Sequence, residues 1–154
     1  MSEPKRKRSP WIKRILIGGI VLLIAGGIAA WLIFTEKFTD TTKREAAFTV
    51  NAMDLLQEFQ KSDSLANIKY AEKIITVNGR VTETEAADTT INIKMIDTAT
   101  SAYIIFAFQQ QHLAEAKQLK EGDSVSIKGS CSGGTYSDIL STEFVTFKRC
   151  AINK

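Results

Sequence analysis

The chain has 154 residues, which is enough for one domain with a sizeable core and too few for two large ones. Its net charge of +3 is unevenly distributed. The first 14 residues carry six Lys and Arg against one Glu, whereas residues 35–154 carry 14 Lys and Arg against 16 Asp and Glu, a net charge of −2. The outer part of the chain is therefore mildly acidic, which argues against a domain that binds polyanions through bulk positive charge.

An apolar run follows the basic start of the chain. Residues 15–34, from Ile15 to Phe34, include 20 residues without a charged side chain. At about 1.5 Å per helical residue this run covers about 30 Å, the thickness of the hydrocarbon core of a bilayer. Trp11 and Trp31 lie near its ends, where aromatic rings favour the membrane interface. We therefore expect a single transmembrane helix in the cell membrane, with residues 1–14 as a cytoplasmic basic tail and the remainder extracytoplasmic.

A cleaved signal peptide is the alternative for this segment. Its apolar run is typically about 7–15 residues long and ends at a small-x-small site. The best such site here is Ile28-Ala29-Ala30, where a bulky Ile occupies a position that requires a small residue. The run also continues as apolar sequence after this point. An uncleaved signal anchor therefore fits the sequence better.

Helical patterns open the outer part of the chain. Residues 35–47 show no clear apolar period, and we interpret them as a linker that precedes an extracytoplasmic domain at residues 48–154. A helix follows Asn51, a suitable N-cap residue. Its apolar positions recur at helical spacing, at Ala52, Leu55, Leu56 and Phe59. A second short helix is expected over residues 64–70, capped by Asp63.

The apolar pattern then changes to the two-residue period of strands with one buried face. Three strands are expected over residues 73–83, 90–96 and 102–108. A short helix over residues 109–119 follows them. Two further strands are expected over residues 124–131 and within residues 139–152.

Five short strands with a helix between the third and fourth is the order of an OB-fold barrel. Gly79 and Gly129 lie near strand centres, which suits a small barrel whose strands coil sharply. An SH3-like barrel also has five strands but lacks the intervening helix. The sequence therefore predicts a mainly β fold, a five-stranded OB-fold barrel with short flanking and inserted helices, preceded by one N-terminal transmembrane helix.

A family resemblance supports this fold. It is carried by an ordered set of short motifs, Phe48-Thr49-Val50, Leu55-Leu56 with Phe59, Ala66-Asn67, Lys69-Tyr70, and residues 73–79, 122–133 and 145–150. Together these motifs resemble the tRNA_anti-like group of bacterial OB-fold proteins, many of them anchored in the cell envelope. The resemblance implies the OB-fold over most of the outer domain, and it supplies no catalytic motif.

The two cysteines, Cys131 and Cys150, both lie in the outer domain. In an oxidising compartment, two thiols on neighbouring strands are natural disulfide partners. A bridge needs Cα atoms within about 7 Å, so the two face one another only if the last hairpin turn centres near Leu140. We expect a disulfide between them. Two buried free thiols are the alternative, because the sequence does not determine the register of the last strand.

No pattern in the sequence points to catalysis. There is no nucleophile motif, and the glycines after Cys131 follow a strand into a hairpin, with no helix N-terminus to bind a phosphate. Two distant cysteines and His112, the only histidine, make no metal-ligand spacing. We predict no catalytic residue, metal or cofactor, and expect His112 to be a solvated surface side chain.

A candidate ligand face is formed by outward polar and aromatic residues, Asn78, Arg80, Asn92, Lys94, Tyr103 and Tyr136. We expect it to contact an envelope protein or a glycan, with an ordinary solvated surface as the alternative reading. OB-folds also bind single-stranded nucleic acid, and Tyr103 with nearby cations is a minimal set for stacking and charge. The three carboxylates of residues 82–88 and the net negative charge make nucleic acid an unlikely ligand.

A small ligand is the third hypothesis. The chain resembles the cytochrome c maturation chaperone, which also joins an N-terminal anchor to an outer OB-fold. That family attaches haem through a His followed four residues later by a Tyr, whereas here His112 is followed by Ala116. This departure argues against a haem role, and another small ligand would need a pocket.

Overall fold

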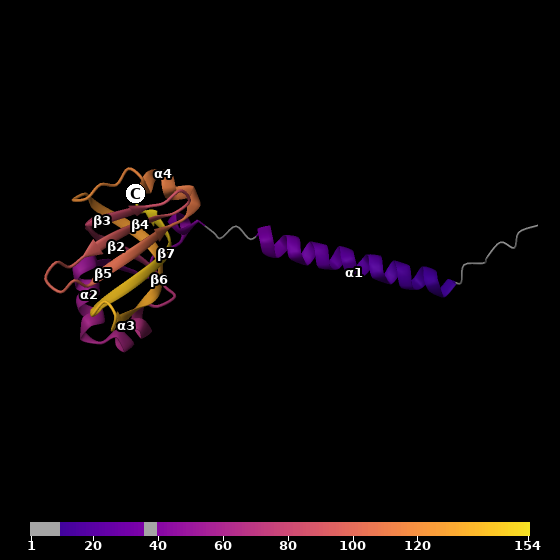
Figure 1. The fold of residues 1–154 in the computed structure, drawn as a ribbon, viewed down its shortest axis with the longest axis horizontal. Coiled ribbons are helices and arrows are strands. Elements are labelled where there is room, and N and C mark those ends of the chain that lie inside the picture. The colour runs from indigo at the N-terminus through magenta and orange to yellow at the C-terminus, as the bar shows by residue number, and fades with distance from the viewer. Residues whose placement is uncertain (1–9, 36–39) are drawn as a thin grey trace, which may run out of the picture. The chain divides into compact units, whose positions relative to one another are not determined.

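The computed structural model describes residues 10–35 and 40–154, and the chain divides into two compact units, residues 1–38 and 39–154. In the first unit, α1 (Pro10–Thr35) is one continuous helix (Figure 1). Its apolar side chains are exposed. Its span Arg14–Ile33 is long and apolar enough to cross a membrane. The predicted apolar helix is therefore present, and most of the predicted basic tail lies outside the described residues.

The second unit begins with a segment that packs onto the domain. η1 (Thr41–Lys43) is a 3₁₀-helix capped by Asp40, whose carboxylate accepts a hydrogen bond from the Thr42 N–H at 3.0 Å. Thr41 is 2% exposed. The predicted linker at residues 35–47 is therefore bound to the domain from Asp40 onward, and residues 36–39 lie outside the described residues.

Two helices follow the first strand, β1 (Phe48–Asn51). α2 (Ala52–Lys61) is capped as predicted, because the Asn51 side chain accepts from the Met53 N–H at 2.9 Å, and it buries the predicted apolar residues. α3 (Asp63–Tyr70) begins one residue earlier than predicted, since Ser62 is its N-cap. Both helices pack against the sheet through their buried faces.

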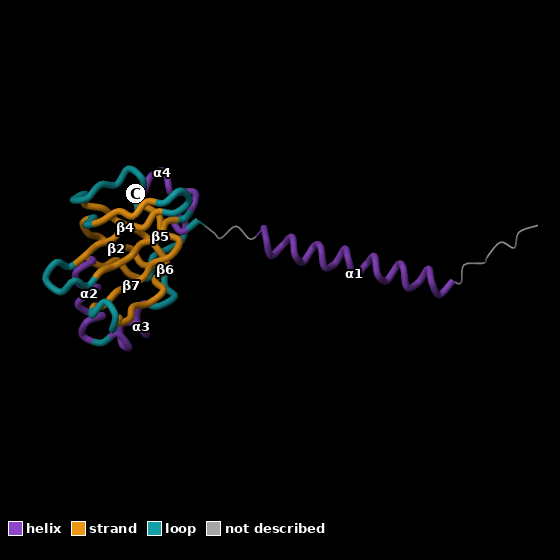
Figure 2. The backbone as a smooth tube through the Cα atoms, viewed as in Figure 1, coloured by secondary structure: helices purple, strands orange, loops and turns teal. Residues whose placement is uncertain are grey.

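The strands form one sheet in the order β1-β2-β6-β7-β5-β4-β3. The strands after β1 are β2 (Ile74–Arg80), β3 (Glu83–Ala86), β4 (Ile91–Ile96), β5 (Tyr103–Phe108), β6 (Ser124–Ser137) and β7 (Thr142–Ile152). The pairs β1–β2 and β5–β7 are parallel, and the other pairs are antiparallel. Two short helices, η2 (Gln110–His112) and α4 (Leu113–Ala116), connect β5 to β6. Figure 2 shows the strands as the body of this unit, with α2 and α3 at one end and α4 at the other.

The observed sheet differs from the predicted five-stranded barrel in two respects, and it does not confirm that barrel. It has seven strands, and it is not closed, since β1 and β3 are its edges. β1 pairs with β2 as an additional strand, and the predicted strand at residues 73–83 is interrupted at Val81 and Thr82. The Val81 N–H donates to the Asp123 carbonyl and the Thr82 N–H donates to the Lys94 carbonyl, each at 2.9 Å. The chain thus changes partners at this point.

The core lies between the inner face of the sheet and the helices. Alternate residues of the strands are fully buried as predicted, Ile75, Val77, Ile93, Met95, Ile104, Phe106, Ile127, Val145 and Phe147. Gly79 permits α2 and β4 to pack closely against β2, because a Cβ at this position would lie 2.6 Å from the Met95 Sδ and 2.8 Å from the Ala52 Cβ. A side chain at this position would separate α2 from the sheet.

The two cysteines are buried free thiols. The hairpin turn lies at residues 138–141, and register shifts in the β6–β7 ladder place Cys131 opposite Phe147. Cys150 packs its sulfur above Gly129, where a Cβ would come within 2.6 Å of the sulfur. Burial raises the pKa of Cys131 to about 11 and also raises the pKa of Cys150, so both thiols stay protonated. The structure therefore has the alternative arrangement in place of the predicted bridge.

Candidate ligand-binding face

The six predicted face residues lie in three places. Lys94 on β4 lies beside Tyr103 on β5, the neighbouring strand, whereas Asn92 pairs with Ala107, four residues farther along β5. Two strands, β6 and β7, separate β5 from β2, which carries the exposed Asn78 and Arg80. Tyr136 lies near the end of β6, opposite Glu143 on β7, and is 53% exposed. The structure thus brings two of the six residues, Lys94 and Tyr103, into contact.

An aromatic pair forms the centre of this face. Tyr103 on β5 and Phe144 on β7 are partners in the parallel ladder, and their ring centroids are 5.7 Å apart with an interplanar angle of 14°. Both residues are partly exposed. Because the next residues, Ile104 and Val145, are fully buried, strand alternation directs the two rings to the outer face of the sheet. The pair is a preformed aromatic surface.

Lys94 supplies a cation beside this pair. Its Nζ lies 5.9 Å from the centroid of the Tyr103 ring, and it forms ion pairs with Glu83 at 3.2 Å and with Glu85. The hydrogen bond that Lys94 donates to Glu85, together with the one that it donates to Glu83, raises the pKa of Lys94. Two carboxylates on β3 therefore balance the charge of Lys94, and this part of the face carries no net positive charge.

Phe144 was missed as a face residue by the sequence prediction. The apolar residues Val145 and Phe147 of the last strand alternate and are buried on the inner face. Side chains alternate between the two faces of a strand, so the same pattern directs Phe144 and Thr146 outward. The sequence therefore contained the information needed to find Phe144, because the residues between the buried ones of a strand lie on its opposite face.

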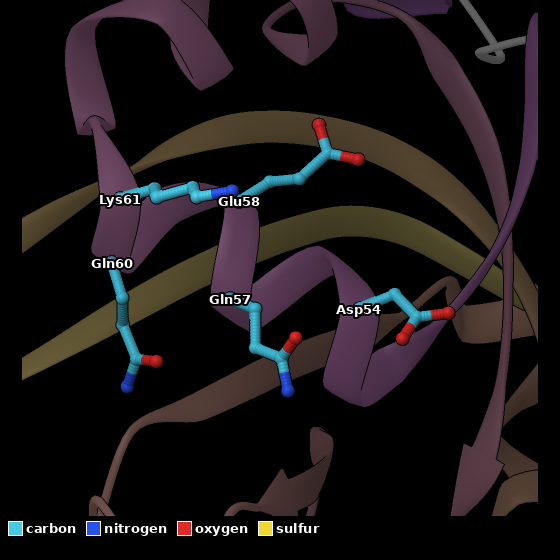
Figure 3. Close-up of a pocket in the computed structure, with 5 residues that line it drawn as sticks. All are labelled: Asp54, Gln57, Glu58, Gln60 and Lys61. Carbon is cyan, nitrogen blue, oxygen red and sulfur yellow. The ribbon is translucent and has the colours of Figure 1, made fainter.

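A second hollow, over α2, is less suited to a ligand. Figure 3 shows that its side chains extend from one helix in different directions and do not converge on a common point. They belong to Asp54, Gln57, Glu58, Gln60 and Lys61. The Glu58 carboxylate already accepts hydrogen bonds from Lys69 at 2.8 Å and from the Tyr70 hydroxyl at 3.0 Å. This hollow is the polar surface of an amphipathic helix.

His112 is not the solvated side chain that the sequence predicts. It is 13% exposed, and its Nε2 lies 2.9 Å from the Asp40 carboxylate, while its Nδ1 lies 3.8 Å from Glu115. The hydrogen bond with His112 lowers the pKa of Asp40 below its usual value. The contact fastens the segment before η1 to the end of η2, and we assign His112 this structural role.

The acidic, histidine and cysteine side chains do not gather into a metal site. Among residues 10–35 and 40–154, no group of three or more of them lies close enough together to hold a metal ion. Glu143 is a buried carboxylate, 7% exposed, whose Oε1 makes no hydrogen bond with the described residues. Burial raises its pKa. The aromatic face is the arrangement best suited to bind a ligand.

Comparisons with known proteins identify a matching family model and similar solved structures. The tRNA_anti-like family model matches residues 7–143. A solved structure from Klebsiella pneumoniae, described as a "putative nucleic acid-binding lipoprotein", is similar with a TM-score of 0.54 and 18% identity, covering 68% of this chain and 91% of that chain. An OBody bound to hen egg-white lysozyme is similar with a TM-score of 0.42 and 17% identity, covering 56% of this chain and 87% of that chain. No curated protein sequence matches. The Klebsiella likeness shows a shared fold.

Proposed function

The chain belongs to the tRNA_anti-like family, and we propose that it is a membrane-anchored, non-catalytic OB-fold module that binds its ligand on the outer face of β4, β5 and β7. The observation that carries this proposal is the partly exposed, stacked pair of Tyr103 and Phe144. Aromatic side chains on a sheet are stacking platforms, worth about 1–3 kcal/mol for each stacked base in OB-folds that bind single strands. Rigid strands hold the two rings in place, so binding orders few side chains.

The proposed OB barrel is supported by the way β2 and β3 are connected. Only Val81 and Thr82 separate the two strands. β2 pairs with β6, and β3 pairs with β4, so the two strands act as one bent strand that changes neighbours. Counted in this way, the sheet has five strands in addition to β1, which is the number of strands in an OB-fold.

The proposed anchor is supported by α1, whose apolar side chains are exposed, with Leu23 at 78%. The full chain is expected to remain in the membrane pellet after alkaline carbonate extraction. Protease added to intact spheroplasts is expected to digest the domain, because the basic residues precede α1. Release of the chain by carbonate would contradict the anchor, and protection of the domain would contradict the orientation.

The ligand face is tested with the full chain in nanodiscs and two defined probes, the single-stranded oligonucleotide dT12 and tetra-N-acetylglucosamine. Isothermal titration calorimetry is expected to detect binding of one probe. Tyr103→Ala should weaken it by about tenfold, as expected for the loss of one stacking contact. Tyr136→Ala removes another exposed tyrosine outside the pair and should leave the affinity unchanged. Equal effects of the two variants would contradict the assigned face.

Single-stranded nucleic acid is the second candidate ligand, favoured by the family and by the position of Lys94 over the Tyr103 ring. A phosphate near Lys94 would have to displace Glu83 or Glu85 from their ion pairs. Because nucleic-acid binding releases counterions, the dT12 affinity should fall steeply between about 50 and 200 mM salt if phosphates are contacted. A salt-independent affinity would exclude this mode of binding.

A further inference from the structure

A groove lies on the outer face of β6 and β7, next to the aromatic pair. Its volume of about 460 Å³ falls within the range of small-ligand pockets, about 300–1,000 Å³. It is lined by residues 132–135 of β6, by Phe144, Thr146 and Lys148 of β7, and by Asn67 of α3. We infer that this β6–β7 groove binds a sugar ring of an uncharged glycan. The inference rests on the proposed function and names the class of its ligand.

The Phe144 ring is the apolar wall of the β6–β7 groove. Tyr103 stacks against one face of this ring. The ring also lines the groove, so its remaining face is available on that side. The C–H face of a pyranose ring is apolar, and packing it on an aromatic ring removes apolar surface from water.

Three uncharged hydroxyl side chains line the groove, those of Ser132, Thr135 and Thr146. In the described part of the chain, none of these three hydroxyls makes a hydrogen bond with another residue. Each hydroxyl is one donor and two acceptors, and it can rotate to suit its partner. Sugar hydroxyls have the same donor and acceptor capacity, so the rim matches their chemistry.

The floor of the groove is bare backbone that α3 holds in place. Gly133 has a φ of +104°, and a Cβ there would lie 2.5 Å from the Asn67 Oδ1. The Asn67 amide donates to the Gly134 carbonyl at 2.8 Å and accepts from the Gly134 N–H at 2.9 Å. The groove is therefore preformed, and a ligand does not have to order its floor.

The charges around the groove favour an uncharged polymer over a nucleic acid. Lys148 is the one charged residue among those that line it. Lys94, on the other side of Tyr103, is paired with Glu83 and Glu85. Binding of single-stranded nucleic acid relies on a series of cations that follow the phosphates. The face does not supply such a series, whereas a neutral glycan does not require one.

The inference is tested by calorimetry on the full chain in nanodiscs, with tetra-N-acetylglucosamine as the probe and dT12 as the competitor. We expect the saccharide to bind with the same affinity at about 50 and 300 mM NaCl, because it carries no charge. Phe144→Leu should weaken binding about tenfold through the lost ring contact. Thr146→Val should weaken it about fivefold through the lost hydrogen bond. The matched control Thr49→Val, at an exposed position of β1, should change nothing.

The outcomes separate this inference from the proposed function. If dT12 binds in a manner that depends on Tyr103 and Phe144 while the saccharide does not bind, the proposed function stands and the glycan is overturned. If the Thr146→Val and Thr49→Val variants bind the saccharide with equal affinity, the groove is not the saccharide site, and the proposed function is unaffected. If neither probe binds, both proposals fail. Far-UV circular dichroism of each variant establishes that a lost affinity does not reflect unfolding.

Discussion

Two phenylalanines of β7, three residues apart, have opposite surroundings. Phe147 is fully buried and packs its ring 5.1 Å from that of Phe106, on the inner face of the sheet. Phe144 is partly exposed and stacks on Tyr103, on the outer face. Both make one aromatic contact with a residue of β5, at centroid distances of 5.1 and 5.7 Å. The ring contacts are therefore alike, and the two residues differ in how much surface they withdraw from water.

This difference separates residues that maintain the fold from residues that are available to a ligand. Burial of a large apolar side chain stabilises a domain by about 1.5–3 kcal/mol, and its truncation also leaves a cavity. A partly exposed ring on a sheet contributes less to the fold, and the surface it leaves exposed can bind a partner. The predictions below test this contrast, beginning with the largest expected change in the free energy of unfolding.

Phe147→Ala should reduce the free energy of unfolding by about 3–5 kcal/mol, because it removes a fully buried ring and leaves a cavity beside Phe106. Urea unfolding of the full chain in detergent, followed by circular dichroism, measures the change. Phe147→Leu is the control, and it should lose clearly less because most of the volume is retained. A loss below about 1 kcal/mol for Phe147→Ala would contradict the contrast, because the buried ring would then stabilise the fold no more than the partly exposed one.

Gly134→Ala should reduce the free energy of unfolding by about 1–3 kcal/mol through overpacking. The added Cβ would lie 2.5 Å from a ring carbon of Phe59 and 3.0 Å from a methyl carbon of Val145. Combining it with Phe59→Leu, which frees space, should cost less than the sum of the two single changes. Strict additivity would show that this contact does not limit the packing of α2 on the sheet. Thermal unfolding of the four proteins measures the coupling.

Glu143→Gln should increase the free energy of unfolding at pH 7 by about 1 kcal/mol, since the buried carboxylate has an oxygen without a partner. The pKa of Glu143 in the folded chain is raised above 4.5 by burial, so the folded state binds a proton more readily than the unfolded state. The stability of the wild type should therefore fall as the pH rises from 4.5 through the folded pKa. The advantage of Gln should disappear near pH 4, and a constant difference at both values would contradict this account.

Phe144→Ala should change the free energy of unfolding least, by no more than about 1 kcal/mol, because the ring is partly exposed. The same variant should lose binding of whichever probe the wild type binds. Urea unfolding and calorimetry on one preparation measure both quantities. A large loss of stability would show that Phe144 belongs to the core and would weaken its assignment to the ligand face.

The sequence predicted the elements that depend on local periodicity. The N-cap at Asn51, the apolar face of α2 and the inward residues of the strands were confirmed, because each follows from a repeat of 3.6 or two residues. The family resemblance was also confirmed. The interruption at Val81 and Thr82 was not predicted, since it depends on hydrogen bonds to Asp123 and Lys94, which are distant in the sequence.

The candidate face was predicted in part for the same physical reason. Lys94 and Tyr103 lie together because a short hairpin joins their strands. Phe144 reaches Tyr103 through a parallel pairing between strands more than 30 residues apart, which local patterns do not show. The place of Cys131 opposite Phe147 depends on register shifts in β6 and β7. Register at bulges is set by tertiary packing.

We expect the Asn67 amide also to protect the domain from association with other copies of itself. β2 pairs with β6 as far as Ser130, and Cys131 of β6 then makes main-chain hydrogen bonds with Glu72 and Lys73. Beyond Cys131, β7 is the one strand of the described residues that pairs with β6. Such a free margin of main chain is a template on which a strand of another molecule can assemble. By donating to and accepting from Gly134, the Asn67 side chain imitates the peptide group of a neighbouring strand and occupies this margin. One side-chain amide is thereby expected to block the addition of a strand from another molecule at this position.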